Sequence, residues 1–222
     1  MPSLKTITPI LGGNYYHLFN RGSNCQNIFY LPKNYDYFLK LLKDFLGDYV
    51  YFLAYSLMPN HFHLVIKIKD EIVTEKGEDQ EDEGTVLSEE NGSMTGSLII
   101  KDEVEIGKIV VKQLKRMFIT YAMAINNQEN RVGNLFDPKY KRLLIENQDY
   151  LEYVIFYTHF NPEKHGIANN FRTYRFSSFK AINGTGKTSI ARDLVHELYG
   201  GKEGFLNYHN VLHEERTDII LE

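Results

Sequence analysis

Hydrophobic and polar positions along the chain follow two periods, which predict strands and helices. Alternation typical of strands covers residues 14–21, 49–57, 61–69 and 140–145. Apolar residues recur every three or four positions, the spacing of amphipathic helices, over residues 31–46, 108–126 and 149–160. Pro59-Asn60 is a turn signal, and the last helix is expected to stop near Asn161-Pro162, with Gly166 as its terminator.

The resulting order is strand, helix, strand, strand, helix, strand, helix. Its first six elements match a split βαβ, ferredoxin-like sandwich, an α+β fold whose antiparallel sheet carries helices on one face. The seventh element is an added helix with chemistry of its own. We predict a single domain over residues 1–180 and a C-terminal tail over 181–222, with a helical stretch near Ile190–Leu198.

Acidic residues are concentrated in one segment. Residues 70–106 contain 13 Asp or Glu against two Lys, a charge of −11, whereas the rest contains 23 basic against 16 acidic residues, a charge of +7. The centre of this segment, Glu75–Ser97, lacks aromatic residues and is rich in Glu, Asp, Gly and Ser. Such a composition buries too little apolar surface to offset the entropy of ordering. We therefore predict a flexible acidic insertion at about 70–106 within a basic domain.

Composition also narrows the class of protein. The apolar fraction of 43% and charged fraction of 24% are ordinary for a soluble globular protein. No apolar run approaches the roughly 20 residues that span a bilayer, and no hydrophobic signal region follows the N-terminus. Cys25 is the only cysteine, which excludes a disulfide framework and a Cys-based zinc site. We expect a protein of the reducing cytoplasm.

The strongest local motif is His61-Phe62-His63, on the third predicted strand. Side chains alternate along a strand, so the two histidines share one face while Phe62 points to the core. Two imidazoles about 7 Å apart at the backbone can chelate one divalent cation if a third ligand comes from elsewhere. The motif is also compatible with two half-buried histidines on an amphipathic strand.

A second motif lies on the last predicted helix, where Tyr157 and Asn161 are four residues apart and share a face. A tyrosine hydroxyl aimed at a metal-bound phosphate can attack phosphorus and form a covalent phosphotyrosine. Asn161 can offer an oxygen to the same metal. An aromatic core helix in which Tyr157 only packs is the alternative.

Together, the two motifs resemble the HUH-type single-tyrosine transposases of bacterial insertion sequences, most closely the REP-associated tyrosine transposase branch. In that family two histidines flank one bulky apolar residue. A later Tyr is followed four residues on by Asn-Pro, then by a basic residue and Gly. Three further segments match, Tyr16–Gly22, Leu135–Arg142 and Tyr174–Ser178. The resemblance covers about residues 14–180, but the branch is usually more uniformly basic and lacks the acidic insertion.

The resemblance implies a metal-dependent single-strand DNA endonuclease/transposase that cleaves and rejoins hairpin-associated DNA. It implies that Tyr157 forms a 5′-phosphotyrosine and leaves a free 3′-hydroxyl. His61 and His63 become metal ligands, Asn161 a candidate third ligand, and Mg²⁺ or Mn²⁺ the cation. The implied partner is single-stranded or hairpin DNA, and a monomer is slightly favoured over a homodimer because this branch carries its own tail.

Basic residues interleaved with aromatic ones suit single-stranded DNA, because bases stack on rings while cations follow the backbone. The candidate phosphate contacts are Arg21, Lys112, Lys115, Arg116, Lys141, Arg142, Arg172 and Arg175.

Two other functions are compatible with the sequence. A catalytically silent module that binds hairpin DNA or RNA would keep the motifs as structure and form no covalent product. A metal-dependent phosphodiesterase would use His61 and His63 with a water nucleophile, and its turnover would not require Tyr157.

Overall fold

The computed structural model describes residues 8–75, 85–90 and 93–220. Its main sheet has the strand order β2-β3-β1-β7, and every neighbouring pair is antiparallel. The strands are β1 (Tyr15–Arg21), β2 (Val50–Met58), β3 (His61–Ile68) and β7 (Lys141–Ile145). Because β3 lies between β1 and β2, the sheet has the predicted split βαβ, ferredoxin-like topology.

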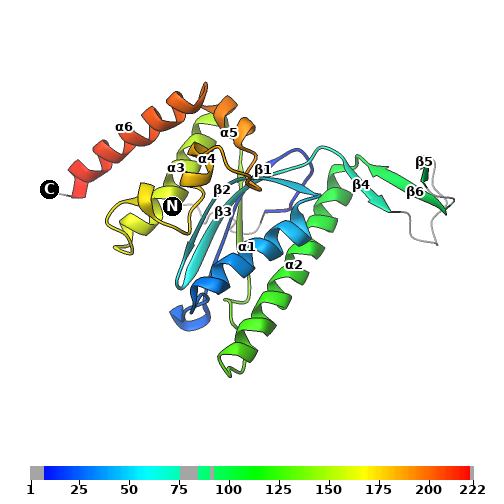
Figure 1. Ribbon diagram of the computed structural model, residues 1–222, viewed down its shortest axis with the longest axis horizontal. Coiled ribbons are helices and arrows are strands. Elements are labelled where there is room, and N and C mark those ends of the chain that lie inside the picture. The colour runs from blue at the N-terminus through cyan, green and yellow to red at the C-terminus, as the bar shows by residue number, and fades with distance from the viewer. Residues whose placement is uncertain (1–7, 76–84, 91–92, 221–222) are drawn as a thin grey trace.

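Helices cover both faces of this sheet. On one face, α1 (Pro32–Leu46) packs against α2 (Glu103–Gln128), and on the other α3 (Gln148–Lys164) packs on β2 and β3. Figure 1 shows the sheet between these two layers. A side-chain oxygen at the start of each helix accepts a hydrogen bond from a backbone N–H and so stabilises the first turn. The oxygen belongs to Asn34 in α1, to Asp102 in α2 and to Asn147 in α3. α3 corresponds to the added helix that the sequence predicts as the seventh element.

Aromatic rings fill the space between the sheet and the α1/α2 layer. Phe62 points into this layer, as strand alternation predicts, and its ring lies 5.2 Å from that of Phe38 and 5.7 Å from that of Phe118. The fully buried Phe38 also packs edge-to-face on Tyr121, with 4.9 Å between ring centres. Tyr121 donates its hydroxyl proton to the carbonyl oxygen of Ile28 at 2.8 Å. These contacts hold β3, and with it the histidine motif, in place.

Replacing Phe38 with Ala is expected to lower the free energy of unfolding by about 3–5 kcal/mol, because a buried ring gives way to a cavity. Urea unfolding followed by circular dichroism measures the change. Phe45→Ala, at a partly buried position of the same helix, is the control and should cost less. Equal losses in the two variants would contradict the central role of Phe38.

The end of α3 differs from the sequence expectation. The helix continues through Pro162 to Lys164 instead of stopping near Asn161-Pro162. Proline removes one backbone donor, but its φ is compatible with a helix. The last turn is closed by His165 N, which donates to Asn161 O at 3.0 Å. Gly166 adopts φ +66°, a conformation that favours glycine, and ends the helix as predicted.

The segment after α3 packs against that helix and the edge strand β2. It contains η2 (Phe171–Thr173), α4 (Phe179–Asn183), α5 (Arg192–Leu198) and α6 (Lys202–Ile220), while η1 (Ser23–Cys25) follows β1. The predicted helical stretch near residues 190–198 corresponds to α5 and is confirmed. Within the described parts of the chain, no helix combines the length and apolar character that crossing a membrane requires.

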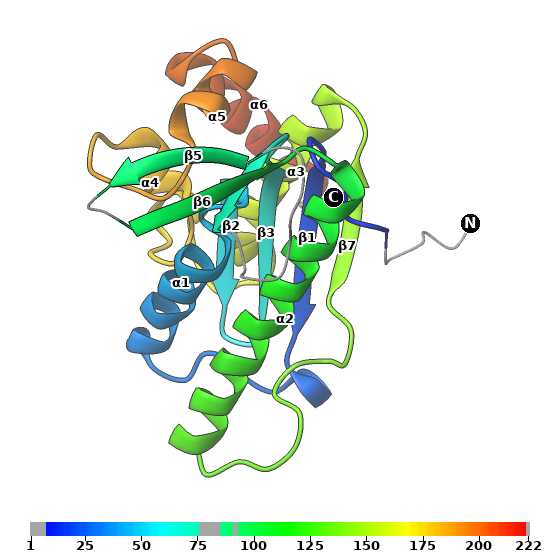
Figure 2. The ribbon, with the colours of Figure 1, turned by 90° about the vertical axis from the view of Figure 1, so that its right-hand side faces the viewer.

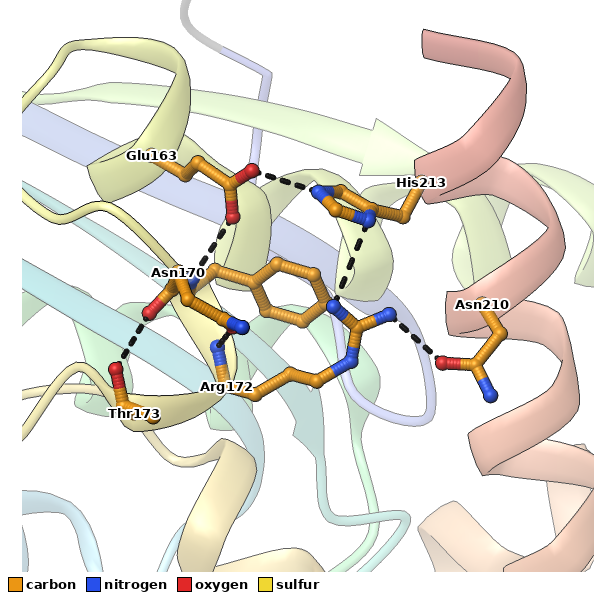
Figure 3. A network of polar contacts seen from close by, with 7 residues as sticks. Glu163, Asn170, Arg172, Thr173, Asn210 and His213 are labelled. Carbon is orange, nitrogen blue, oxygen red and sulfur yellow. Dashed lines mark hydrogen bonds and ion pairs between the residues drawn. The ribbon is translucent and has the colours of Figure 1, made fainter. Parts of the chain in front are cut away.

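A polar network joins α6 to the end of α3 (Figure 3). Glu163 pairs with Nε2 of His213 at 2.6 Å and accepts the backbone N–H of Phe171 at 2.8 Å. Arg172 donates from Nη2 to Asn210 Oδ1 at 2.7 Å. The network fixes the C-terminal helix relative to the helix that carries Tyr157.

A buried chain of hydrogen bonds makes a second connection. Because the carbonyl of Phe205 only accepts, His209 Nδ1 carries the proton of their 2.9 Å bond. His209 Nε2 then accepts from His159 Nδ1 at 3.0 Å, and His159 Nε2 accepts from Ser178 Oγ at 2.8 Å. Ser178 Oγ in turn accepts from the backbone N–H of Tyr55 at 2.9 Å. With both histidines neutral, each of their four ring nitrogens takes part in one of these hydrogen bonds.

Stability is expected to fall below about pH 6.5 because of His209. Burial is the main cause that lowers its pKa to about 3, and the charge of Arg172 adds to the effect. Between that pKa and the unfolded value near 6.5, the unfolded chain binds more protons, so this contribution is full above pH 6.5 and is lost as pH falls. The contribution of His209 to the slope is about 1.4 kcal/mol per pH unit, and the other buried histidines add to it.

Urea unfolding of the unaltered protein and of His209→Gln at a series of pH values measures the contribution of His209 as the difference between the two slopes. In His209→Gln the proton uptake on unfolding should fall by about one below pH 6.5. The same pH dependence in the variant and the unaltered protein would show that His209 is not responsible.

The acidic insertion contains regular structure that the composition did not predict. Strands β4 (Ile72–Glu75), β5 (Thr85–Glu90) and β6 (Ser93–Ile100) form an antiparallel sheet in the order β4-β6-β5. Figures 1 and 2 show this sheet projecting beside the N-terminal end of α2. The flexible acidic insertion predicted at about 70–106 thus contains these strands and the first residues of α2, which begins at Glu103. Residues 76–84 and 91–92 of the insertion lie outside the described residues.

Candidate active site on the α3 face of the sheet

β1 and β3 place polar side chains on the sheet face that α3 covers. His61 and His63 share this face, with their ring centres 5.5 Å apart. Their cross-strand partners on β1 are Arg21 and Phe19, which therefore point the same way. The predicted orientation of the two histidines is confirmed.

Hydrogen bonds fix the orientation of both imidazoles. His61 Nδ1 lies 2.7 Å from Asn60 Oδ1, which only accepts, so Nδ1 carries the proton and Nε2 keeps a lone pair. His63 Nδ1 lies 2.9 Å from His17 Nε2. Among the described residues, the Nε2 atoms of His61 and His63 have no hydrogen-bond partner. Such a pairing of one ring nitrogen is how proteins commonly orient a metal-binding histidine.

Burial keeps these histidines neutral. It lowers the pKa of His17 and of His61 to about 4, and at His61 the charge of His165 adds to the lowering. Burial also lowers the pKa of His63 well below its usual value, with His17 as the next contributor. Neutral imidazole is the form that binds metals, so the pair is available to a cation at neutral pH.

α3 brings Tyr157 to the same face. Its ring lies edge-on to His63 at 5.8 Å and to His17 at 6.4 Å between ring centres. Lys164, two turns further along α3, places its ammonium 4.9 Å from the centre of the Tyr157 ring. The predicted nucleophile and one predicted metal ligand therefore meet in space, although they come from α3 and β3.

Asn161 lies one helical turn beyond Tyr157 and is fully buried. Its Nδ2 donates to the carbonyl of Tyr157 at 2.8 Å. Its Oδ1 is also buried and has no hydrogen-bond partner in the part of the chain that the structure describes. An unpaired buried oxygen costs about 1–3 kcal/mol, so this atom has an unused capacity to bind a cation or a water.

A pocket of about 670 Å³ is lined by His61 and His63 together with His165. The rings of His61 and His165 lie 5.2 Å apart, edge-to-face. Tyr157 and Asn161 do not line this pocket. The histidine pair is therefore reached from the pocket on one side, while Tyr157 packs against it from α3.

Cations surround the same pocket. Arg21, Lys139 and Lys141 all line it. Arg21 is held by Asp137 at 2.8 Å, and the ammonium of Lys141 lies 5.7 Å from the centre of the Phe19 ring. These positive groups make the pocket attractive to phosphate.

By their chemistry, two neutral imidazole nitrogens and an amide oxygen are donor atoms that would suit a divalent cation. Among the described residues, no group of three or more His, Cys, Asp or Glu is placed to hold a metal ion, so a third ligand would be of another type. The unpaired Oδ1 of Asn161 is an atom of that kind. Two neutral imidazoles and an amide oxygen would leave both charges of the ion uncompensated, which favours binding of a phosphate.

The eight predicted phosphate contacts are spread over several surfaces. Two of them line the histidine pocket, Arg21 and Lys141. Two line a separate groove beside α2, Lys115 and Arg142. Two are exposed on α2 itself, Lys112 and Arg116. The last two lie after α3, Arg172 and Arg175.

The last two arginines have partners within the chain. Arg172 belongs to the network of Figure 3. The guanidinium of Arg175 lies 5.2 Å from the centre of the Phe176 ring and 4.0 Å from the carboxylate of Asp36. Neither of them lines the histidine pocket.

Local sequence patterns assign no role to four side chains that lie at the site, namely His17, Lys139, Lys164 and His165. Strand alternation places His17 on the same face as Phe19 and Arg21, which was a usable signal. Its contact with His63 depends on the pairing of β1 with β3, which local patterns do not specify. Lys164 and His165 occur within the Tyr157 motif, but only the three-dimensional course of α3 shows which groups they face.

No family model and no curated protein matches this chain. A similar solved structure is that of a REP-associated tyrosine transposase bound to a REP hairpin. It is 17% identical, with a TM-score of 0.49, and the match covers 81% of this chain and 84% of that chain.

Proposed function

We propose that this protein is a metal-dependent, HUH-type single-strand DNA endonuclease/transposase in which Tyr157 is the nucleophile. The observation that carries the proposal is the Tyr157 ring edge-on to His63, on a face where the Nε2 atoms of His61 and His63 have no hydrogen-bond partner among the residues that the structure describes. A phenol beside two neutral imidazoles suits a nuclease that forms a phosphotyrosine.

The proposed step exchanges one phosphate ester for another. The Tyr157 hydroxyl oxygen bonds to phosphorus and the bond from phosphorus to the 3′ oxygen breaks, which yields a 5′-phosphotyrosine and a 3′-hydroxyl. Tyr157 releases its proton to water, and the leaving 3′ oxygen takes up a proton. The 3′-hydroxyl of an incoming strand can reverse the step, so rejoining needs no external energy source.

Mg²⁺ or Mn²⁺, held by His61, His63 and Asn161, would polarise the phosphate and offset charge on its oxygens. The ammonium of Lys164, over the Tyr157 ring, favours the negative charge that develops on the phenol oxygen. Arg21, which lines the histidine pocket, is positioned to bind a flanking phosphate.

We propose hairpin DNA with a single-stranded flank as the substrate. Tyr157 packs against a histidine of its own chain, which supports cleavage by a monomer. A dimer that exchanges the α3 helices between subunits would instead place Tyr157 beside the partner's histidine pair.

The test is incubation of the protein with Mn²⁺ and labelled hairpin oligonucleotides whose single-stranded flanks are randomised. We expect strand cleavage together with a protein–DNA adduct that survives denaturation, and neither product in EDTA. Hairpin binding without either product would show instead a silent binding module.

One observation favours a second candidate function. His61 and His63 line the pocket, whereas Tyr157 does not, so a water molecule can approach the pair without the tyrosine. In that case the protein is a metal-dependent phosphodiesterase with a water nucleophile. It would cleave the same oligonucleotides without forming the adduct.

A further inference from the structure

A second groove, of about 810 Å³, lies between α2 and the segment that leads into β7. Its lining is largely aromatic and aliphatic. The ring of Phe118 lies 5.3 Å from that of Phe136 and 5.4 Å from that of Tyr140. Ile119, also in the lining, is 49% exposed. A groove of this size falls within the range of about 300–1,000 Å³ that is typical of ligand sites.

Cations accompany these rings. Lys115 and Lys139 line the groove and are exposed to solvent. The guanidinium of Arg142 lies 5.6 Å from the centre of the Tyr140 ring and donates to its hydroxyl at 3.0 Å. The acidic residue of the lining, Asp137, is paired with Arg21 outside the groove. The charge of the groove is therefore complementary to an anionic ligand with flat apolar parts.

Hydrogen bonds hold the groove in shape. Ser23 N donates to the carbonyl of Leu135 at 3.0 Å, and Asn126 Nδ2 donates to that of Gly133 at 2.9 Å. Asn20 Nδ2 donates to the carbonyl of Asp137 at 3.2 Å. The surface is therefore already ordered, and binding of a ligand would lose little free energy to ordering it.

The groove adjoins the histidine pocket around the edge strand β7. Asn20, Asp137 and Lys139 line both, and Lys141 and Arg142 of β7 point to the pocket and to the groove respectively. A strand whose phosphate reaches His61 and His63 can therefore cross the end of β7 into the groove. Lys139, at the junction, can contact the backbone of such a strand.

We propose that the α2 groove binds unpaired nucleotides of the substrate strand, with bases on the Phe118 and Tyr140 rings and phosphates on Lys115 and Lys139. Alternating rings and cations is the arrangement by which proteins hold single strands. This inference rests on the proposed function for the identity of the strand, and it adds a binding site outside the histidine pocket.

The test compares two variants of α2 in the full chain. Ile119→Glu places a negative charge in the groove, and Met123→Glu makes the same change one turn later, at a position that is 67% exposed and outside the groove. Affinity for fluorescein-labelled oligothymidylate is measured by anisotropy in EDTA, where no cleavage occurs. Circular dichroism and thermal unfolding verify that both variants are folded.

We expect Ile119→Glu to weaken binding about tenfold or more and Met123→Glu to have little effect. Lys115→Gln should reduce the slope of log affinity against log salt by about 0.7, the value for one phosphate contact on a single strand. Equal affinities of the two glutamate variants would overturn the groove assignment even if the unaltered protein forms the covalent adduct. Weakening by Ile119→Glu in a protein that forms no adduct would support the groove and contradict the proposed nuclease.

Discussion

Tyr157→Phe is expected to abolish the covalent protein–DNA adduct and to leave hairpin binding within about twofold of the unaltered protein. Phenylalanine lacks the hydroxyl that bonds to phosphorus in the proposed step, so no ester could form. Its ring keeps the packing against His63 and the contact with Lys164, so α3 should be undisturbed. The measurement is a denaturing gel of labelled hairpin DNA incubated with Mn²⁺, together with binding measured by anisotropy in EDTA.

Tyr153 provides the matched control. It lies one turn earlier on α3, its ring centre is 6.3 Å from that of Tyr157, and its hydroxyl accepts from Arg216 at 2.8 Å. Tyr153→Phe should form the adduct at the rate of the unaltered protein. An adduct that survives Tyr157→Phe would remove this tyrosine as the nucleophile. Cleavage that continues without any adduct would support a water nucleophile.

The parts of the fold that the sequence predicts well depend on neighbouring residues. Strand alternation alone separates Phe62 from His61 and His63, and helical spacing alone places Asn161 one turn beyond Tyr157. The ferredoxin-like order of elements follows because each strand and helix is predicted locally. None of these inferences requires knowledge of which strands pair.

The parts that the sequence predicts poorly depend on long-range pairing. His17 and His63 are 46 residues apart, and their hydrogen bond exists because β1 pairs with β3 in one register. The strands of the acidic insertion form by pairing with each other, which supplies hydrogen bonds that an argument from composition omits. Composition describes the burial that a segment can achieve alone. It does not account for the backbone hydrogen bonds that β6 forms with β4 and β5.

The candidate phosphate contacts show the limit of treating basic residues as one group. Lys141 and Arg142 are adjacent on β7, so strand alternation sends them to opposite faces, one to the histidine pocket and one to the α2 groove. The sequence alone predicts that these two side chains point to opposite faces, because they are consecutive on a predicted strand. Arg172, in contrast, is bound to Asn210 of a helix that only the folded chain brings near.

The hydrogen bonds at the site separate two kinds of residue, the proposed metal ligands and the residues that orient them. Asn60 and His17 pair with the Nδ1 atoms of His61 and His63, and in the described part of the chain no group pairs with their Nε2 atoms. Loss of an orienting residue commonly lowers metal affinity about 10- to 100-fold, and loss of a ligand is more severe. Substitutions at the two kinds of residue should therefore differ in size and in their response to added metal.

His61→Ala is expected to lower Mn²⁺-dependent cleavage by more than about 100-fold, because it removes a nitrogen that we propose as a metal ligand. Asn161→Ala should cause a comparable loss if its unpaired Oδ1 completes the site. His17→Gln should lose less, about 10- to 100-fold, and recover in excess Mn²⁺, since it only orients His63. Cleavage rates across a Mn²⁺ titration, with thermal unfolding as a check of the fold, measure all three effects.

His196, on α5 and outside the histidine pocket, is the control, and His196→Ala should cleave normally. His165→Ala tests the remaining imidazole of the pocket. It should lose less than Asn161→Ala, because His61, His63 and His165 do not form a three-ligand group. A larger loss of cleavage in His165→Ala than in Asn161→Ala would assign the third ligand to His165. Unchanged cleavage in His61→Ala would exclude a metal held by the His61-Phe62-His63 motif.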